Sequence, residues 1–168
     1  MRRVVVRRLA LAAGVAALLA AVAWQVRRER TASPDTLLAL DPAAVTRIEV
    51  QVAGGPLRRF ERRDRHWWMT APQAGRADDA HLADLAAIAA APAVQWRPLA
   101  DFAPAKIGLA PPAATLTLDG ETLAFGTLAP FERARYVRVG ARVALVPDRY
   151  TPYLAVDPKR ELAAPSSR

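Results

Sequence analysis

Five arginines gather in one short segment that ends in two tryptophans. Its sequence, RRFERRDRHWW, runs from residue 58 to residue 68. A guanidinium group presents a planar fork of donors that matches phosphate and carboxylate oxygens, and an indole can stack on sugars, bases or the guanidinium itself. The candidate ligand-binding or partner-binding residues are therefore Arg58, Arg59, Arg62, Arg63, Arg65 and Trp67.

The same segment also has a purely structural interpretation. Charge on an exposed edge strand prevents edge-to-edge pairing with other chains, and Glu61 and Asp64 neutralise part of the cluster. In an alternating strand only one of Trp67 and Trp68 faces outward, so the other belongs to the core. Both interpretations predict a charged β-hairpin here.

Histidine and aspartate also lie close together in the sequence, at His66, Asp78, Asp79 and His81. Asp78 and His81 are three residues apart and would share one face of a helix. A zinc site, however, takes three or four ligands at characteristic spacings, with further groups that orient them. These residues match no such spacing, so we expect no metal and no cofactor, and a helix-capping aspartate instead.

Residues for nucleophilic or acid–base catalysis are scarce. The chain has no cysteine, which excludes disulfides, thiolate metal ligands and a cysteine nucleophile. Its three serines, Ser33, Ser166 and Ser167, lie near the two ends of the chain, away from any predicted scaffold. Glu121 and Glu132 are the acids in loops that could form a carboxylate pair, and nothing else supports that pair. We therefore expect no enzymatic activity and no small-molecule substrate.

An uncharged stretch of 18 residues, Leu9–Val26, comes before the region that holds these candidates. As a helix it would span about 27 Å, close to the roughly 30 Å of a bilayer core. Four arginines precede it and three follow it, offset by Glu29, which favours a cytoplasmic N-terminus. We predict a single-pass anchor over 1–28 in a bacterial inner membrane, with the domain periplasmic. A cleavable signal peptide ending at Ala23 is the alternative.

The positive charge of the chain is concentrated in this region. The formal net charge is +8, but residues 1–30 hold seven arginines and one glutamate. Residues 31–168 hold 17 basic and 15 acidic residues. Because the excess flanks the apolar stretch, it is poor evidence for nucleic-acid binding, and no nucleic-acid partner is expected.

A polar tether is predicted over 29–44, and a folded domain over 45–160. Residues 45–52 alternate apolar and polar side chains, as a half-buried strand does. Two further strands are predicted over 57–62 and 66–70, and a helix begins near Asp78 and runs to Pro92. A short strand over 94–97 completes this half.

The second half of the domain repeats this order. Strands are predicted over 115–118, 122–125, 135–139 and 142–146, with Asp119-Gly120 as a hairpin turn and a short helix after Tyr150. We therefore predict an α+β fold, with duplicated βββα halves over 45–98 and 107–157. Antiparallel sheet or sheets would be covered by helices, and residues 161–168 would form a disordered tail.

Four features together resemble the DUF4340 family of bacterial proteins. They are RRDRHWWMTAP at 62–72, IGLAPPAATLTLDGETLAFG at 107–126, RYVRVGARVALV at 135–146 and the N-terminal apolar segment. The resemblance covers 45–157 and implies a membrane-anchored domain outside the cytoplasm. For some members it implies association with ABC-transporter or gliding-motility-type subunits, and it implies no catalytic residue. This chain has Arg63-Asp64-Arg65 where the family usually has a glycine, and arginine would strain a turn that needs positive φ.

The leading functional expectation is a non-enzymatic, membrane-anchored interaction or accessory domain. Its partner would be an envelope protein, within an ABC-transporter-type or other envelope complex. The alternative is a binding module for an anionic envelope ligand, a lipid headgroup or a polymer, that uses the Arg58–Arg65 hairpin.

Overall fold

A computed structural model describes residues 36–130, 133–155 and 161–162 of this chain. The chain divides into two units, residues 1–34 and 35–168, and all described residues belong to the second. The predicted membrane segment, Leu9–Val26, lies outside the described residues. Within the described ranges, no helix combines the length and apolar character that crossing a bilayer requires.

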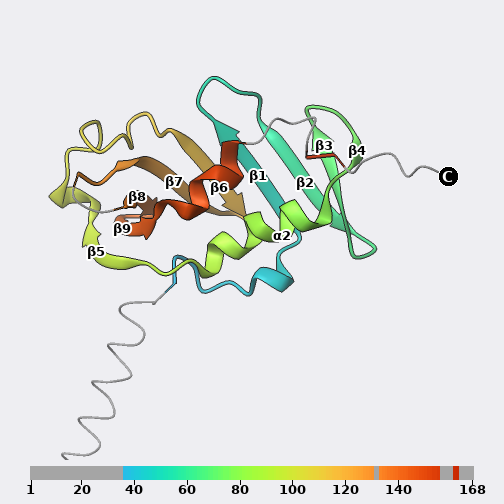
Figure 1. Ribbon diagram of the computed structural model, residues 1–168, viewed down its shortest axis with the longest axis horizontal. Helices are drawn as coiled ribbons and strands as arrows, with labels where there is room; N and C mark the ends of the chain where they lie inside the picture. The colour runs from blue at the N-terminus through green and yellow to red at the C-terminus, as the bar shows by residue number, and fades with distance from the viewer. Residues whose placement is uncertain (1–35, 131–132, 156–160, 163–168) are drawn as a thin grey trace, which may run out of the picture. The chain divides into compact units, whose positions relative to one another are not determined.

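The described residues form one antiparallel sheet of nine strands (Figure 1). The strands follow the order β4-β3-β2-β1-β6-β7-β8-β9-β5 across the sheet. Their bounds are β1 (Arg47–Val52), β2 (Arg58–Arg63), β3 (His66–Ala71), β4 (Gly75–Arg76), β5 (Val94–Pro98), β6 (Ala114–Leu118), β7 (Glu121–Leu128), β8 (Ala134–Val139) and β9 (Arg142–Pro147).

The central pair of the sheet is β1 and β6, which are far apart in the chain. Ile48 lies opposite Leu118 and Val50 opposite Leu116, so apolar side chains of both strands face the same side. The predicted Asp119-Gly120 turn, with φ of 46° and 98°, joins β6 to β7. The Asp119 carboxylate also accepts a hydrogen bond of 2.8 Å from the Arg47 N–H, which joins the β6–β7 turn to the start of β1.

One α-helix, α2 (Asp79–Ala87), is present in the described part of the chain. Asp78 caps it by accepting a 2.9 Å hydrogen bond from the Ala80 N–H. The chain continues from α2 into the 3₁₀ turn η2 (Ile88–Ala90) and then into β5, which lies at the opposite edge of the sheet from β4. The other 3₁₀ segments are η1 (Pro42–Ala44), η3 (Leu99–Asp101) and η4 (Asp148–Ala155).

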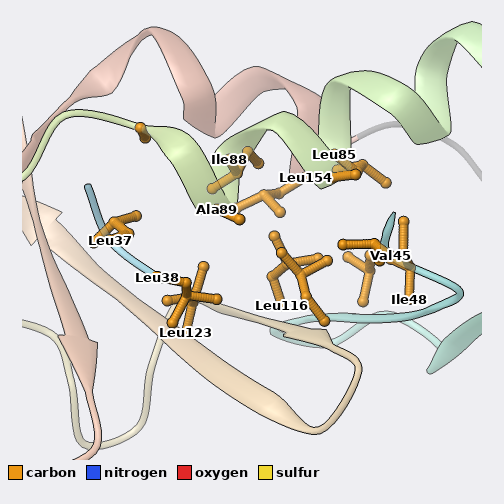
Figure 2. Packing of buried hydrophobic residues seen from close by; sticks show 14 of the residues in the cluster. Leu37, Leu38, Val45, Ile48, Leu85, Ile88, Ala89, Leu116, Leu123 and Leu154 are labelled. Carbon is orange, nitrogen blue, oxygen red and sulfur yellow. The ribbon is translucent and has the colours of Figure 1, made fainter. Parts of the chain in front are cut away.

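The main core lies between the sheet and this helical layer. Figure 1 shows α2, in green, and η4, in red, on one face of the sheet. In Figure 2, Leu85 of α2, Ile88 of η2 and Leu154 of η4 face Leu116 and Ile48 of the sheet. Burial of such side chains is the dominant favourable term in folding.

The predicted tether over 29–44 supplies part of this core. Leu37 and Leu38 are buried, and their N–H groups donate to Ala91 and Ala89 carbonyls at 3.0 and 2.9 Å. The folded body therefore begins earlier than residue 45.

A second, smaller cluster lies around Leu109, Ala124 and Val143. Leu99, Phe102 and Ile107 of the connection between β5 and β6 pack against it. The connection approaches β7 so closely that a Cβ added to Gly126 would lie 2.2 Å from the Ile107 carbonyl oxygen. Glycine is therefore required at residue 126.

The predicted α+β fold is wrong at the level of architecture. The structure is predominantly β, with one continuous nine-stranded sheet and few helical residues. Most predicted strands exist, but β1 pairs with β6 and joins the two halves. In addition, β5 of the first predicted half pairs with β9 of the second. Periodicity identifies strands, whereas long-range pairing decides whether they form one sheet or two.

Candidate functional site

The turn between β2 and β3 places the centre of the arginine-rich segment in a left-handed conformation. Asp64 has φ of 50° and Arg65 has φ of 66°. A two-residue hairpin turn of this kind favours Asn-Gly or Asp-Gly, because side chains other than Asn and Asp are strained there. The strain expected for arginine in this connection is therefore found at Arg65.

Arg58 is directed into the interior. Its side chain is 3% exposed, and it forms an ion pair with Glu161, which is fully buried. Arg58 also donates a 2.6 Å hydrogen bond to the Leu154 carbonyl oxygen. His81 lies 3.2 Å from the same Glu161 oxygen. Arg58, predicted as a candidate binding residue, is thus part of a buried polar cluster that binds the C-terminal segment.

Arg59 and Arg63 lie on the sheet face that α2 does not cover, and each is paired with an acid. Arg59 Nε is 3.3 Å from a Glu49 oxygen. Arg63 donates a 2.7 Å hydrogen bond to Glu61, and this bond lowers the pKa of the Glu61 carboxyl. The two arginines therefore have their charge largely matched by neighbouring carboxylates.

Arg62 and Arg65 face a different surface, a cleft of about 360 Å³. The cleft lies between η1, the β2–β3 hairpin and α2. Arg62 donates a 2.7 Å hydrogen bond to the Ala43 carbonyl oxygen, and its guanidinium carbon lies 6.0 Å from the centre of the Trp67 ring. The lining residues are Pro42, Ala43, Arg62, Arg65, Trp67, Asp79, Ala83 and Ala86.

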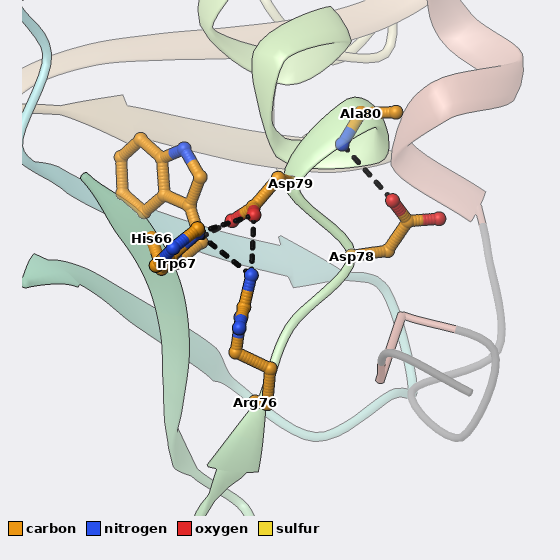
Figure 3. A network of polar contacts seen from close by, with 6 residues as sticks. All are labelled: His66, Trp67, Arg76, Asp78, Asp79 and Ala80. Carbon is orange, nitrogen blue, oxygen red and sulfur yellow. Dashed lines mark hydrogen bonds and ion pairs between the residues drawn. The ribbon is translucent and has the colours of Figure 1, made fainter. Parts of the chain in front are cut away.

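Asp79, at the start of α2, is the single acid among these lining residues. One of its oxygens accepts a 2.7 Å hydrogen bond from the Trp67 N–H, and the other lies 2.7 Å from Arg76 and 2.9 Å from His66 Nδ1 (Figure 3). Desolvation raises the pKa of Asp79, but these hydrogen bonds outweigh it and hold the pKa at about 2. The carboxylate is therefore ionised at neutral pH, and the charge of Arg76 matches it.

Of the two tryptophans of the hairpin, one is buried and the other is exposed, as alternation predicts. Trp67 is 4% exposed and Trp68 is 39% exposed. Trp67 therefore contributes mainly packing to the wall of the cleft, and its ring holds the Arg62 side chain in place.

The histidines and aspartates considered as metal ligands belong to two separate networks. His66 contacts Asp79, whereas His81 contacts Glu161, and Asp78 caps α2. No group of three or more potential ligands that could hold a metal ion occurs within residues 36–130, 133–155 and 161–162.

Several cleft residues could not be identified as site residues from the sequence. Pro42 and Ala43 come from the predicted tether, and the sequence pattern identifies Ala83 and Ala86 only as residues of an amphipathic helix. Alanine and proline carry no chemistry that would distinguish them. They become part of a site because η1 and α2 both lie beside the hairpin.

Comparisons with known proteins place this chain in no family. No family model, curated protein or solved structure matches it. The resemblance to DUF4340, the role as an accessory domain and the location outside the cytoplasm stay predictions from the sequence.

Proposed function

We propose that the folded body of this chain is a binding module for a small anionic group, held in the cleft by Arg62 and Arg65. The observation that carries the proposal is that these two arginines line one concave surface. The three other arginines of the hairpin are paired with carboxylates elsewhere. Of the candidate arginines over Arg58–Arg65, we therefore propose Arg62 and Arg65 as the anion-binding residues.

The charge balance at the cleft supports an anionic ligand. Asp79 is matched by Arg76 at 2.7 Å, and no acid in the described part of the chain forms an ion pair with Arg62 or Arg65, so these two arginines contribute positive charge to the cleft. Arg62 uses one of its five donors on the Ala43 carbonyl oxygen, which fixes its position and leaves donors for a ligand. A volume of about 360 Å³ lies within the range of about 300–1,000 Å³ typical of ligand sites.

The chemistry expected at this site is recognition without a covalent step. Guanidinium groups bind phosphate and carboxylate oxygens through paired N–H donors. Because both arginines line the same cleft, we expect both to contact a single anion.

Two glycine substitutions in the turn test the proposal. Arg65→Gly removes a strained side chain from a left-handed position, so it is expected to raise the free energy of unfolding by up to about 1 kcal/mol. Asp64→Gly replaces a residue that this conformation tolerates, so it is expected to leave the free energy of unfolding nearly unchanged. Arg65→Gly also removes a cleft cation, whereas Asp64→Gly leaves both arginines in place. The measurement is binding of inorganic phosphate and pyrophosphate by NMR titration at low ionic strength, with unfolding in urea as the stability readout.

We expect the unsubstituted protein and Asp64→Gly to bind, and Arg65→Gly to lose at least ten-fold in affinity. Because neither variant is expected to lose stability, which urea unfolding checks, a loss of binding in Arg65→Gly cannot arise from unfolding. Equal affinities in the two variants, or no binding by the unsubstituted protein, would refute the proposal.

A further inference from the structure

The cleft has an apolar floor as well as a cationic rim. Five of its eight lining residues are apolar, namely Pro42, Ala43, Trp67, Ala83 and Ala86. Ala86 is 2% exposed and Trp67 is 4% exposed, so both form firm walls. A free inorganic anion would use the rim and leave the accessible apolar surface, at Pro42, Ala43 and Ala83, in contact with water.

The floor is open because the helix presents small side chains there. Ala83 and Ala86 are three residues apart on α2 and share the face turned toward the hairpin. Leucine has comparable helix propensity to alanine, so the helix itself does not require alanine at Ala83. An apolar hollow beside two guanidinium groups matches a ligand with an apolar part and an anionic end.

We propose that the occupant is a monomeric amphiphile in which one phosphate or carboxylate carries a single short apolar chain or ring. This inference rests on the proposed function and adds the class of ligand. The anionic end contacts Arg62 and Arg65, and the apolar part lies between Pro42 on η1 and Ala83 on α2.

The dimensions of the cleft favour a small, single-chain ligand. About 360 Å³ is near the lower end of the range for ligand cavities. A cleft of this size has no room for both chains of a diacyl lipid. A bilayer surface would also meet a hollow where it needs a protruding apolar face.

The experiment uses a series of probes on the full chain: inorganic phosphate, ethyl phosphate, butyl phosphate and hexyl phosphate, below their aggregation concentrations. Burying a methylene increases affinity roughly three- to four-fold, so affinity is expected to rise along the series until the cleft is filled. Ala83→Leu fills the floor, and Ala87→Leu, on the same helix but outside the lining, is the matched control. Shifts of the Ala83 and Ala86 methyl resonances in the unsubstituted protein provide a second readout that needs no variant.

The inference is supported if affinity rises at least ten-fold from phosphate to hexyl phosphate in the unsubstituted protein and in Ala87→Leu, but not in Ala83→Leu. If phosphate binds and the alkyl chain adds less than two-fold, the ligand class is wrong and the anion site stands. A chain-dependent gain that persists in Ala83→Leu, without shifts at Ala83 and Ala86, places the chain elsewhere and overturns the inference. If no probe binds to the unsubstituted protein, both this inference and the proposed function are refuted.

Discussion

At the scale of single residues, Asp79 connects the hairpin to the helical layer. Its carboxylate accepts from the Trp67 N–H on β3 and from Arg76, which precedes α2. It is also the first residue of α2, where a negative charge interacts favourably with the helix dipole. The Asp79 side chain thus connects β3 to α2, and these two elements form walls of the cleft.

Asp79→Asn is expected to lower the free energy of unfolding at neutral pH by about 1 kcal/mol, because a partly exposed carboxylate loses its charge-assisted hydrogen bonds. The folded-state pKa of Asp79 is about 2, below the ordinary value of 3.8. Its contribution is therefore complete above pH 3.8 and is lost as the pH falls towards 2. Urea unfolding of both proteins across this range should show their difference shrinking with acid.

Asp84→Asn is the matched control for this prediction, because Asp84 is an exposed acid on the same helix. A constant difference between Asp79→Asn and the unsubstituted protein from neutral pH to pH 2 would contradict the assigned role of Asp79.

At the scale of elements, the C-terminal segment contributes to the folded body. Glu161 is fully buried beside Arg58, and its carbonyl oxygen accepts a 2.8 Å hydrogen bond from the Asp78 N–H. Leu162 forms a β-bridge with Ala77 and lies against Gly75, where an added Cβ would be 3.0 Å from its side chain. The predicted disordered tail over 161–168 therefore begins with two residues that pack against β4 and α2.

Removing residues 161–168 is expected to lower the free energy of unfolding by about 3 kcal/mol, because it takes a carboxylate away from the buried Arg58. Removing only residues 163–168 is the control, since it leaves Glu161 and Leu162 in place. Chemical unfolding of the two truncated proteins measures the difference. Identical unfolding midpoints would show that the Arg58–Glu161 pair contributes nothing.

At the scale of the whole molecule, one sheet connects parts of the chain that lie far apart. The β1–β6 pair joins the two halves, and α2 leads the chain from one edge of the sheet to the other, where β5 pairs with β9. The cleft depends on this arrangement, because α2 can cover the hairpin only when it starts at the β4 edge. Unfolding of either half should therefore disturb the other.

The placement of the body relative to the membrane is a prediction for the entire chain. The charge bias around residues 9–26 predicts that a reporter fused after Arg168 lies outside the cytoplasm. Alkaline phosphatase, which folds in an oxidising compartment, should be active in such a fusion, and a GFP fusion exported in unfolded form should be dark. Deleting residues 1–28 should reverse both signals. A fluorescent GFP fusion with inactive phosphatase in the full chain would contradict the predicted orientation.

Local structure could be predicted from the sequence because alternation, turn residues and helix caps act between neighbouring residues. Alternation identified the strand at β1, further strands were predicted correctly at β6 and β8, Asp119-Gly120 marked a turn, and Asp78 marked the start of α2. The segment 75–76 was missed, since two residues cannot show a period. The predicted α+β architecture was wrong because side-chain alternation does not determine which strands are neighbours.

The sequence by itself determined where α2 and the strands other than β4 lie and which hairpin carries the arginines, because periodicity, capping and turn preferences act over a few residues. Only the tertiary structure decided the role of each arginine. Glu161, about 100 residues away, takes Arg58 into the interior, whereas η1 and α2 lie beside Arg62 and Arg65 and form the cleft. Charge pairing and concavity depend on which distant segments meet, and no local pattern contains that information.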